Sequence, residues 1–226
     1  MTPHARSPQH ARSTSDRAAL SGPVSGATFL AGLAGALSTA DVPYPRPGSD
    51  ADTIRRFFTG NRGSARLSAA GQLVSAATLG RFTGSVVRLA GAAGPGSRAL
   101  QTTAAVGGAT AVASLAASGF LTAALTTDRA ADDDRAVALH RRAFLAGGVA
   151  HAVGYGLLVG ALGVAGERTG VLPRGLARTA LASAAAGLLA PLYLVAEPAA
   201  WFIPAGRFSG LVVQSVAGVR MARGRR

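Results

Sequence analysis

The sequence predicts an all-α membrane protein, a polytopic bundle of about six transmembrane helices with a short interfacial helix in the first outer loop. Hydrophobic residues make up 49% of its 226 residues and charged residues only 15%, below the roughly 25% that is usual in soluble domains. Apolar segments of about 18–24 residues recur along the chain, the length that a helix needs to cross ~30 Å of hydrocarbon. Arginines collect between these segments, where cationic side chains hold helix ends at the lipid headgroups.

Residues 1–20 are rich in Ser, Arg, His and Pro and lack helical periodicity, which predicts a disordered cytoplasmic tail. The membrane bundle is expected over residues 21–222, and residues 223–226 form a basic cytoplasmic tail. The expected helices cover residues 22–40, 67–87, 103–125, 143–166, 179–196 and 202–219. The first segment, which ends in "LSTAD", also has the pattern of a cleaved signal peptide, but its long polar lead and the later apolar segments favour a retained anchor.

Two of these helices contain residues that are unfavourable inside a transmembrane helix. Arg81 would cost the second helix about 3 kcal/mol at the bilayer centre, so we expect Arg81 and Arg88 to extend toward the headgroups. Pro191 should kink the fifth helix. A soluble, alanine-rich bundle is the competing fold, but the segments are apolar nearly all round, whereas soluble helices have a charged face.

The first outer loop, "SDADTIRRFFTGN", predicts a short amphipathic helix on the outer surface. Ser49 or Asp50 is the candidate N-cap, and Ile54, Phe57 and Phe58 share one face. A solvated loop with incidental aromatic residues is the alternative.

The second outer loop, "TTDRAADDDRAVALHRR", is expected to be a charged connector. Its three adjacent carboxylates would fan out from a helix and not converge on a cation. They therefore predict a solvated turn or a helix start.

Charge placement suggests an orientation. With a cytoplasmic N-terminus, twelve arginines lie in the inner segments and ten in the outer ones, and the C-terminal "RMARGRR" is the clearest positive-inside signal. All 23 basic residues are arginine in an Ala- and Gly-rich chain, which is typical of a GC-rich bacterial genome. The predicted location is a bacterial plasma membrane, with both termini in the cytoplasm.

The net charge of +13 does not predict nucleic-acid binding, because the arginines are dispersed and aromatic residues make up only 5%. The chain has no cysteine, and no phosphate-binding, acyl-transfer or zinc motif is present. We therefore expect no catalytic residues, no cofactor and no metal.

One group of polar residues stands out in the apolar segments. His151 and Tyr155 lie one turn apart in the fourth segment, Glu197 ends the fifth and Arg207 begins the sixth. With this topology they form a candidate intramembrane polar set near the outer side. The structural alternative is that His151 only hydrogen-bonds a neighbouring helix and that Glu197 and Arg207 mark the water boundary.

Small residues recur every fourth position on the same segment, at Gly148, Ala152, Gly156 and Gly160. Such a ridge lets two helix backbones approach closely. We expect it to be a helix-packing face beside the polar set.

Two short motifs, "FFTGNRG" from Phe57 to Gly63 and "RTGVLPRGLAR" over residues 168–178, resemble those of uncharacterised six-helix bacterial integral membrane proteins that share a domain of unknown function. That family has an LPRWL-like cytoplasmic loop, in which Gly175 stands here at the position of the tryptophan. The resemblance implies a six-helix topology over about residues 22–220 and no known activity.

The function that these features favour is a non-enzymatic membrane module that binds a lipid, a small hydrophobe or a partner protein, with membrane lipids or a second copy of the chain as partners. The alternative is a small transporter or membrane enzyme that uses the polar set around His151.

Overall fold

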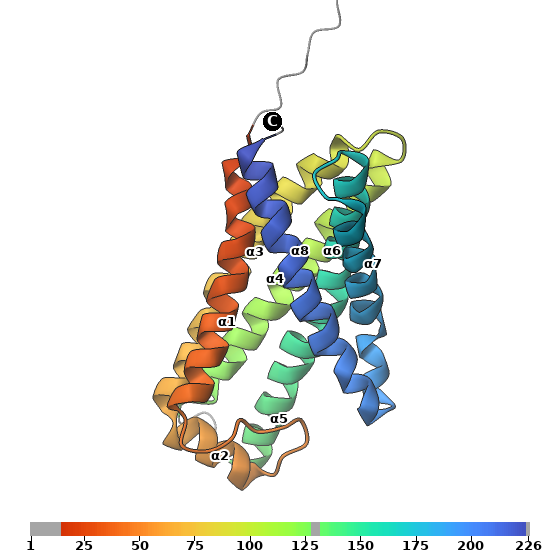
Figure 1. The fold of residues 1–226 in the computed structure, drawn as a ribbon. Coiled ribbons are helices and arrows are strands. Elements are labelled where there is room, and N and C mark those ends of the chain that lie inside the picture. The colour runs from red at the N-terminus through yellow and green to blue at the C-terminus, as the bar shows by residue number, and fades with distance from the viewer. Residues whose placement is uncertain (1–14, 128–131, 225–226) are drawn as a thin grey trace, which may run out of the picture.

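The computed structural model describes residues 15–127 and 132–224, which form helices and no strand (Figure 1). The elements in chain order are a 3-10 helix at Arg17–Leu20, α1 at Ser21–Thr39, α2 at Ala51–Gly60, α3 at Arg62–Gly91, α4 at Ser97–Ala124, α5 at Asp133–Phe144, a π-helical segment at Leu145–Ala150, α6 at His151–Arg168, α7 at Arg174–Leu189, 3-10 helices at Ala190–Leu194 and Glu197–Trp201, and α8 at Phe202–Arg223.

The long helices form a closed ring. Each of α1, α3, α4, α6, α7 and α8 packs against the next in that order, and α8 returns to α1. The connections at residues 92–96 and 169–173 are short, so consecutive helices run antiparallel. α6 is the most enclosed helix, because it also contacts α3 and α8.

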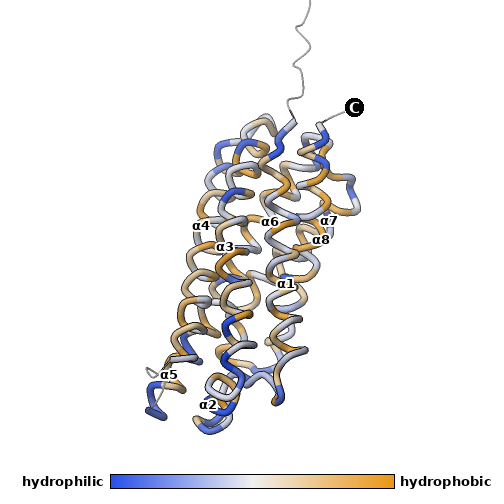
Figure 2. The backbone as a smooth tube through the Cα atoms, turned by 90° about the vertical axis from the view of Figure 1, so that its left-hand side faces the viewer, coloured by the Kyte–Doolittle hydropathy of each residue, from blue (hydrophilic) through white to orange (hydrophobic). Residues whose placement is uncertain are grey.

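Five helices of the described chain are long and apolar enough to cross a membrane, those that begin at Arg17, Ser97, Asp133, Arg174 and Glu197. The protein is therefore a multi-pass membrane protein. Figure 2 shows the most hydrophilic stretches at the two ends of the bundle.

α3 lies in the same ring although it is less apolar than the other long helices. It is 30 residues long, and Arg81 is exposed on its surface. The backbone N–H of Asp16 donates to the carbonyl of Met221 at 3.0 Å, so the two ends of the described chain lie at the same end of the bundle (Figure 1). A chain whose two ends lie at the same end of a bundle crosses that bundle an even number of times. Five of the crossings are made by the apolar helices, and α3 makes the sixth.

The predicted tails overlap the structure only in part. Residues 1–14 and 225–226 lie outside the described residues. Arg17–Leu20, expected in the N-terminal tail, form a helical turn because the carboxylate of Asp16 accepts a hydrogen bond from the backbone N–H of Ala18 at 3.1 Å. Arg223 is still the last residue of α8.

The connector predicted between α4 and the fourth apolar segment is helical from Asp133 onward. The carboxylate of Asp132 accepts from the backbone N–H of Arg135 at 2.9 Å, and Asp133 and Asp134 occupy the first turn, where the helix dipole favours negative charge. The three adjacent carboxylates therefore start a helix. This helix, α5, continues through the π-helical segment into α6.

The helix predicted in the first outer loop is α2, and Asp50 is its N-cap, with a carboxylate that accepts from the backbone N–H of Thr53 at 2.7 Å. Ile54, Phe57 and Phe58 are at most 1% exposed. They pack against Ala65, Leu125 and Ala136 of the bundle and against Tyr44. The apolar face of α2 thus faces protein, and α2 closes one end of the bundle.

Pro191 ends a helix. α7 stops at Leu189, and the chain continues as a 3-10 helix at Ala190–Leu194. Proline lacks the N–H that an α-helix interior needs. The chain then turns at Glu197–Trp201 and enters α8.

Candidate functional site

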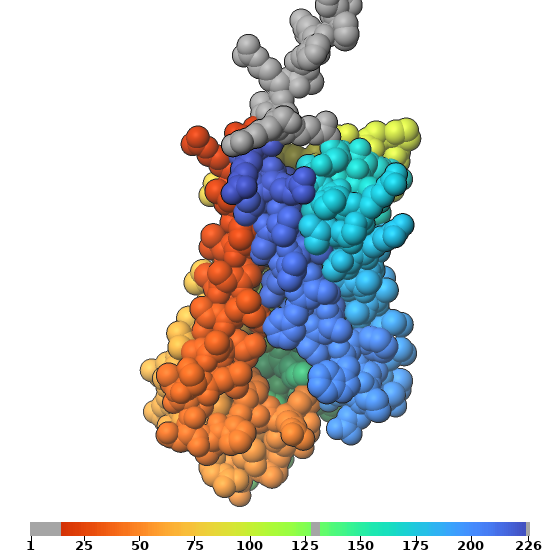
Figure 3. All heavy atoms as spheres, viewed as in Figure 1, coloured from red at the N-terminus to blue at the C-terminus, as the bar shows by residue number. Residues whose placement is uncertain are grey.

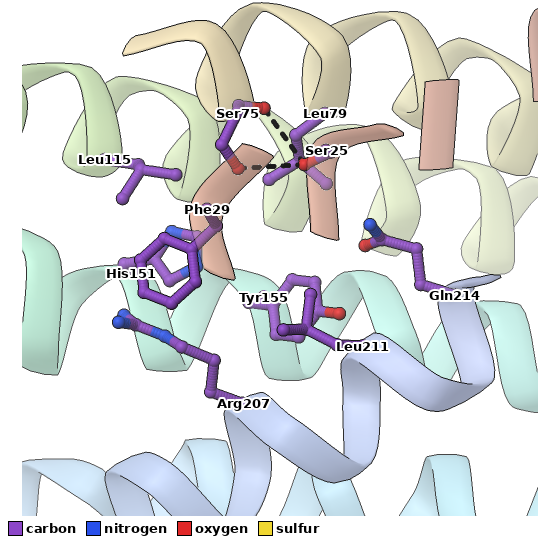
Figure 4. A pocket seen from close by; sticks show the side chains of 10 residues that line it. All are labelled: Ser25, Phe29, Ser75, Leu79, Leu115, His151, Tyr155, Arg207, Leu211 and Gln214. Carbon is purple, nitrogen blue, oxygen red and sulfur yellow. Dashed lines mark hydrogen bonds between the residues drawn. The ribbon is translucent and has the colours of Figure 1, made fainter. Parts of the chain in front are cut away.

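A group of polar and aromatic side chains meets where α6 faces α1 and α8. His151 and Tyr155 come from α6, Arg207 from α8 and Phe29 from α1 (Figure 4). Three of the four residues of the predicted polar set are therefore brought together.

His151 is the first residue of α6 and is buried. Its Nδ1 lies 3.0 Å from the carbonyl oxygen of Ala111 on α4, and because a carbonyl only accepts, Nδ1 is the donor. The ring stacks on Tyr155, with centroids 5.5 Å apart and planes inclined by 12°. The hydrogen bond is the interhelical contact that the structural interpretation of His151 expects.

Arg207 lies in the second turn of α8 and points into the bundle, on the side of the site occupied by His151 (Figure 4). Its Nη2 donates to the carbonyl of Gly147, and its guanidinium carbon lies 4.8 Å from the centre of the Phe29 ring, a cation–π distance. Its Nε is buried and has no hydrogen-bond partner among the described residues. No carboxylate in the described part of the chain pairs with Arg207.

Gly147 lies in the π-helical segment that joins α5 to α6. A π-helical turn bonds residues five apart and disturbs the regular i to i−4 ladder. The carbonyl of Gly147 is therefore placed to accept from another helix, and the donor that reaches it is Arg207. The irregular turn thus positions the arginine.

Glu197 does not join the polar set. It is exposed, in the 3-10 helix before α8, and forms no ion pair with any other described residue. Trp201, four residues later, is 78% exposed, as expected of an interfacial anchor. The two residues lie at the boundary of the bundle.

Beside Tyr155 lies a small chamber lined by both polar and apolar side chains. The Tyr155 hydroxyl points toward Gln214 of α8 (Figure 4), and neither it nor the Gln214 Oε1 has a hydrogen-bond partner within residues 15–127 and 132–224. The Gln214 Nε2 donates to the carbonyl of Gly22 on α1 at 2.7 Å. The chamber volume of about 10 Å³ is close to the ~10–15 Å³ that one water molecule requires.

On its other side, Arg207 faces a larger cavity of about 370 Å³. Its walls are mostly apolar, and they come from α1, α3, α4, α5, the π-helical segment, α8 and the loop at residues 44–47. They include Phe29, Leu33, Leu115, Ala143, Phe144 and Ile203. In Figure 3 the surface is hollowed between α1 and α8, and the green atoms of the α5–α6 region form the floor of the hollow.

The divergence of α1 and α8 produces this hollow. At the end where the chain begins and finishes, the two helices are in contact through small residues, since a Cβ on Gly218 would lie 2.5 Å from the carbonyl of Ala19 and one on Gly26 3.4 Å from Leu211. Farther along, the side chains of Phe29, Leu33 and Ile203 stand between the helices, which separate (Figure 1).

The predicted packing ridge faces α7 over most of its length. A Cβ on Gly156 would lie 3.0 Å from the carbonyl of Ala184, and one on Gly160 3.1 Å from the Ala184 side chain. Ala152 is buried against Gly187 of α7. Gly148 instead lines the large cavity, beside Phe144 of its own helix.

Several residues of the site were not singled out by sequence. Gln72 lines the large cavity with an unpartnered Oε1, and Gln214 lines the small chamber. Both amides stand in apolar segments, which is a usable signal, because polar groups in such segments need partners. No feature of the sequence distinguished Phe29 from the other apolar residues of its segment. Among the described residues, no three His, Asp or Glu side chains are grouped so that they could share a metal ion.

Comparisons with known proteins give no relative: no family model, no curated protein and no solved structure matches the chain. The resemblance drawn from "FFTGNRG" and "RTGVLPRGLAR" therefore stays a prediction.

Proposed function

We propose that this protein is a membrane module that binds an amphiphilic small molecule in the cavity between α1 and α8. The observation that carries the proposal is the cavity of about 370 Å³, walled by apolar side chains and open between two membrane-spanning helices (Figure 3). Volumes of ~300–1,000 Å³ and mostly apolar walls with a few polar groups are typical of ligand sites.

The position of the opening supports a ligand that comes from the lipid phase. The hollow lies beside exposed apolar residues of the surrounding helices, including Leu30 of α1 and Phe208 of α8. A molecule dissolved in the bilayer would reach the cavity sideways, without crossing the polar end that α2 closes. Membrane lipids are thus the proposed source of the ligand.

The proposed role is binding and not catalysis. The polar side chains of the site contact other helices: His151 bonds α4, and Arg207 bonds the π-helical segment and covers Phe29. These contacts hold the side chains in fixed positions around the cavity, which suits a binding site. The alternative of a transporter or membrane enzyme uses the same residues and would require His151 to change its protonation during function.

The proposed setting is a bacterial plasma membrane with both termini in the cytoplasm. At the end that holds the termini, the described arginines include Arg88, Arg168, Arg174 and Arg220, and the acidic residues there are Asp16 and Glu167. Most of the described acidic residues lie at the other end, in α2, α5 and the loops beside them. Acidic residues contribute little to orientation, so the support comes from the arginines in the last turn of α8, Arg220 and Arg223, because basic residues beside a membrane-spanning helix favour the cytoplasmic side.

Binding can be tested with ligands that share one alkyl chain, 1-decanol and decanoate, added to the protein in a neutral maltoside detergent and followed by native mass spectrometry. We expect the wild type to retain at least one of them. Leu33→Trp fills the cavity and should remove binding, whereas Leu30→Trp, on the exposed side of the same helix, should not. If neither ligand binds the wild type, or if both variants bind equally, the cavity is not a ligand site.

A further inference from the structure

Arg207 gives the proposed site a charge preference. It is a permanent cation placed in the wall of an apolar cavity, and the described chain supplies no carboxylate to neutralise it. We infer that the ligand is a single-chain amphiphile with a carboxylate head, held by Arg207. This inference rests on the proposed function and adds the chemical class of the ligand.

The guanidinium is already fixed in the orientation that such a ligand needs. One Nη donates to Gly147, and Phe29 lies against its face, so the side chain is held by two contacts from two different elements. The Nε–H has no partner among the described residues, but it is buried and not exposed to the cavity. The positive charge is thus left without a counter-charge in an apolar wall, which is costly, and a carboxylate at the accessible Nη1 supplies it.

A carboxylate suits the donors that remain. Nη2 donates to the Gly147 carbonyl, and the other terminal nitrogen, Nη1, is left to form a charge-assisted hydrogen bond to a carboxylate oxygen.

The surroundings favour an anion over a cation or a neutral head. None of the described residues that line the cavity is acidic, and Arg46 lies on its outer rim. Tyr44, which also lines the cavity, carries no charge at physiological pH, because a phenol ionises only near pH 10 and burial raises its pKa further, to about 12. No charge on the wall therefore repels an anion at Arg207.

Size limits the ligand to one chain. The cavity volume of about 370 Å³ lies at the small end of the ~300–1,000 Å³ range of ligand sites, which favours a short single chain such as decanoate. A longer chain would extend through the opening between α1 and α8. A two-chain phospholipid would have to leave nearly all of its bulk outside.

The test compares ligands with the same chain and different heads on the purified protein in maltoside at pH 7.5. Decanoate, 1-decanol and decylamine are titrated by native mass spectrometry into wild type, Arg207→Gln and the control Arg220→Gln, which alters an exposed arginine at the far end of the same helix. We expect wild type and control to bind decanoate about 10- to 100-fold more tightly than decanol, the gain of a charge-assisted hydrogen-bonded pair. Decylamine should bind more weakly than decanol. Arg207→Gln should bind decanoate and decanol within about twofold of each other.

Two further arms identify the source of the anion. Propanoate, which is the head without a chain, should not compete with decanoate at equal concentration, and a two-chain phosphatidylglycerol should bind more weakly than decanoate. Tighter binding of the phospholipid would overturn the assignment to a single-chain acid, and full competition by propanoate would overturn the assignment to an amphiphile.

The charge preference is falsifiable even if Arg207→Gln does not fold, because the three decyl ligands are compared on the wild type alone. Equal affinities for decanoate, decanol and decylamine would overturn the inference and leave the proposed function standing. If none of the three ligands binds the wild type, both the charge preference and the proposed function are wrong.

Discussion

At the scale of single residues, the sequence located the histidine–tyrosine pair but not the groups they touch. Four-residue spacing on a helix places His151 and Tyr155 on one face, and their rings do stack. The acceptor for His151, the carbonyl of Ala111, depends on how α4 is rotated and shifted against α6. No local pattern contains that information, because a backbone carbonyl belongs to every residue.

The His151 hydrogen bond can be tested by replacement. Asparagine places an amide N–H near the position of the imidazole Nδ1, so His151→Asn should keep the bond to Ala111 and stay near wild-type stability. His151→Leu removes the donor, breaks this hydrogen bond between α6 and α4 and should lose about 1 kcal/mol. Thermal unfolding in detergent measures both. Equal losses in the two variants would mean that ring stacking on Tyr155, and not the hydrogen bond, sets the contribution of His151.

Asp16 provides a pH-dependent contact at the other end of the molecule. It forms an ion pair with Arg88 at 2.7 Å. Burial raises the pKa of the Asp16 carboxyl, but hydrogen bonds from Arg88 and Ser85 and the charge of Arg88 outweigh it, so the pKa lies below its usual value. The stabilisation is then fully present above the unfolded pKa of about 3.9 and is lost as the pH falls through the lower folded value.

The expected consequence is a small stability difference with a defined pH window. Above pH 5, Asp16→Asn should be less stable than the wild type by less than about 1 kcal/mol, because the arginine is 61% exposed and solvent screens the pair. Below the folded pKa of Asp16 the two unfolding curves should converge. The measurement is the thermal midpoint of both proteins from pH 7 downward through the acid range, and a difference that does not shrink as the Asp16 carboxyl becomes protonated would show that its charge does not stabilise the protein.

At the scale of elements, helix positions followed from apolar length, whereas the irregular joints did not. α5 is highly charged, so a composition-based prediction assigned it to a loop, yet it is a continuous extension of α6 because Asp132 caps it and Ala136, His140 and Ala143 are buried. The π-helical segment likewise has no clear sequence signature beyond Gly147 and Gly148. The residue that bonds to its Gly147 carbonyl, Arg207, comes from sixty residues away.

The small-residue faces of α6 make a second test at this scale. The predicted ridge faces α7, and a second contact, not predicted, brings Gly154 against α4: a Cβ there would lie 2.6 Å from the backbone nitrogen of Ala111. Gly154→Ala should therefore push two backbones apart and lose about 1–3 kcal/mol. Gly175→Ala is the matched control, since it has open space around it on α7, and it should be neutral or gain up to ~1 kcal/mol of helix propensity. A stable Gly154→Ala would mean that α4 and α6 can separate at no cost.

At the scale of the whole molecule, the all-α membrane bundle was predictable and the cavity was not. Apolar length and the arginines between segments are sufficient for the fold class. The cavity exists because α1 and α8 separate along their length. Gly218 and Gly26 allow close contact at one end. At the other end the side chains of Phe29, Leu33 and Ile203 stand between the helices. Arg207 was predicted as part of a polar set with Glu197, and it is the absence of that pairing among the described residues that makes it a candidate anion site.

The number of membrane crossings is the property of the whole molecule that most needs a direct test, because composition supports five helices and the ring contains six. If α3 crosses the membrane despite the exposed Arg81, Gly60 at the end of α2 lies on the same side as Asp134, and Ser97 and the C-terminal end of α8 lie on the other side. The chain has no cysteine, so Gly60→Cys, Ser97→Cys, Asp134→Cys and Gly224→Cys each introduce a single reactive thiol. In intact bacterial cells a membrane-impermeant maleimide should label only Gly60→Cys and Asp134→Cys, and all four variants should react after the cells are opened. Equal labelling of Gly60→Cys and Ser97→Cys in intact cells would mean that α3 does not cross the membrane and would contradict the six-pass bundle.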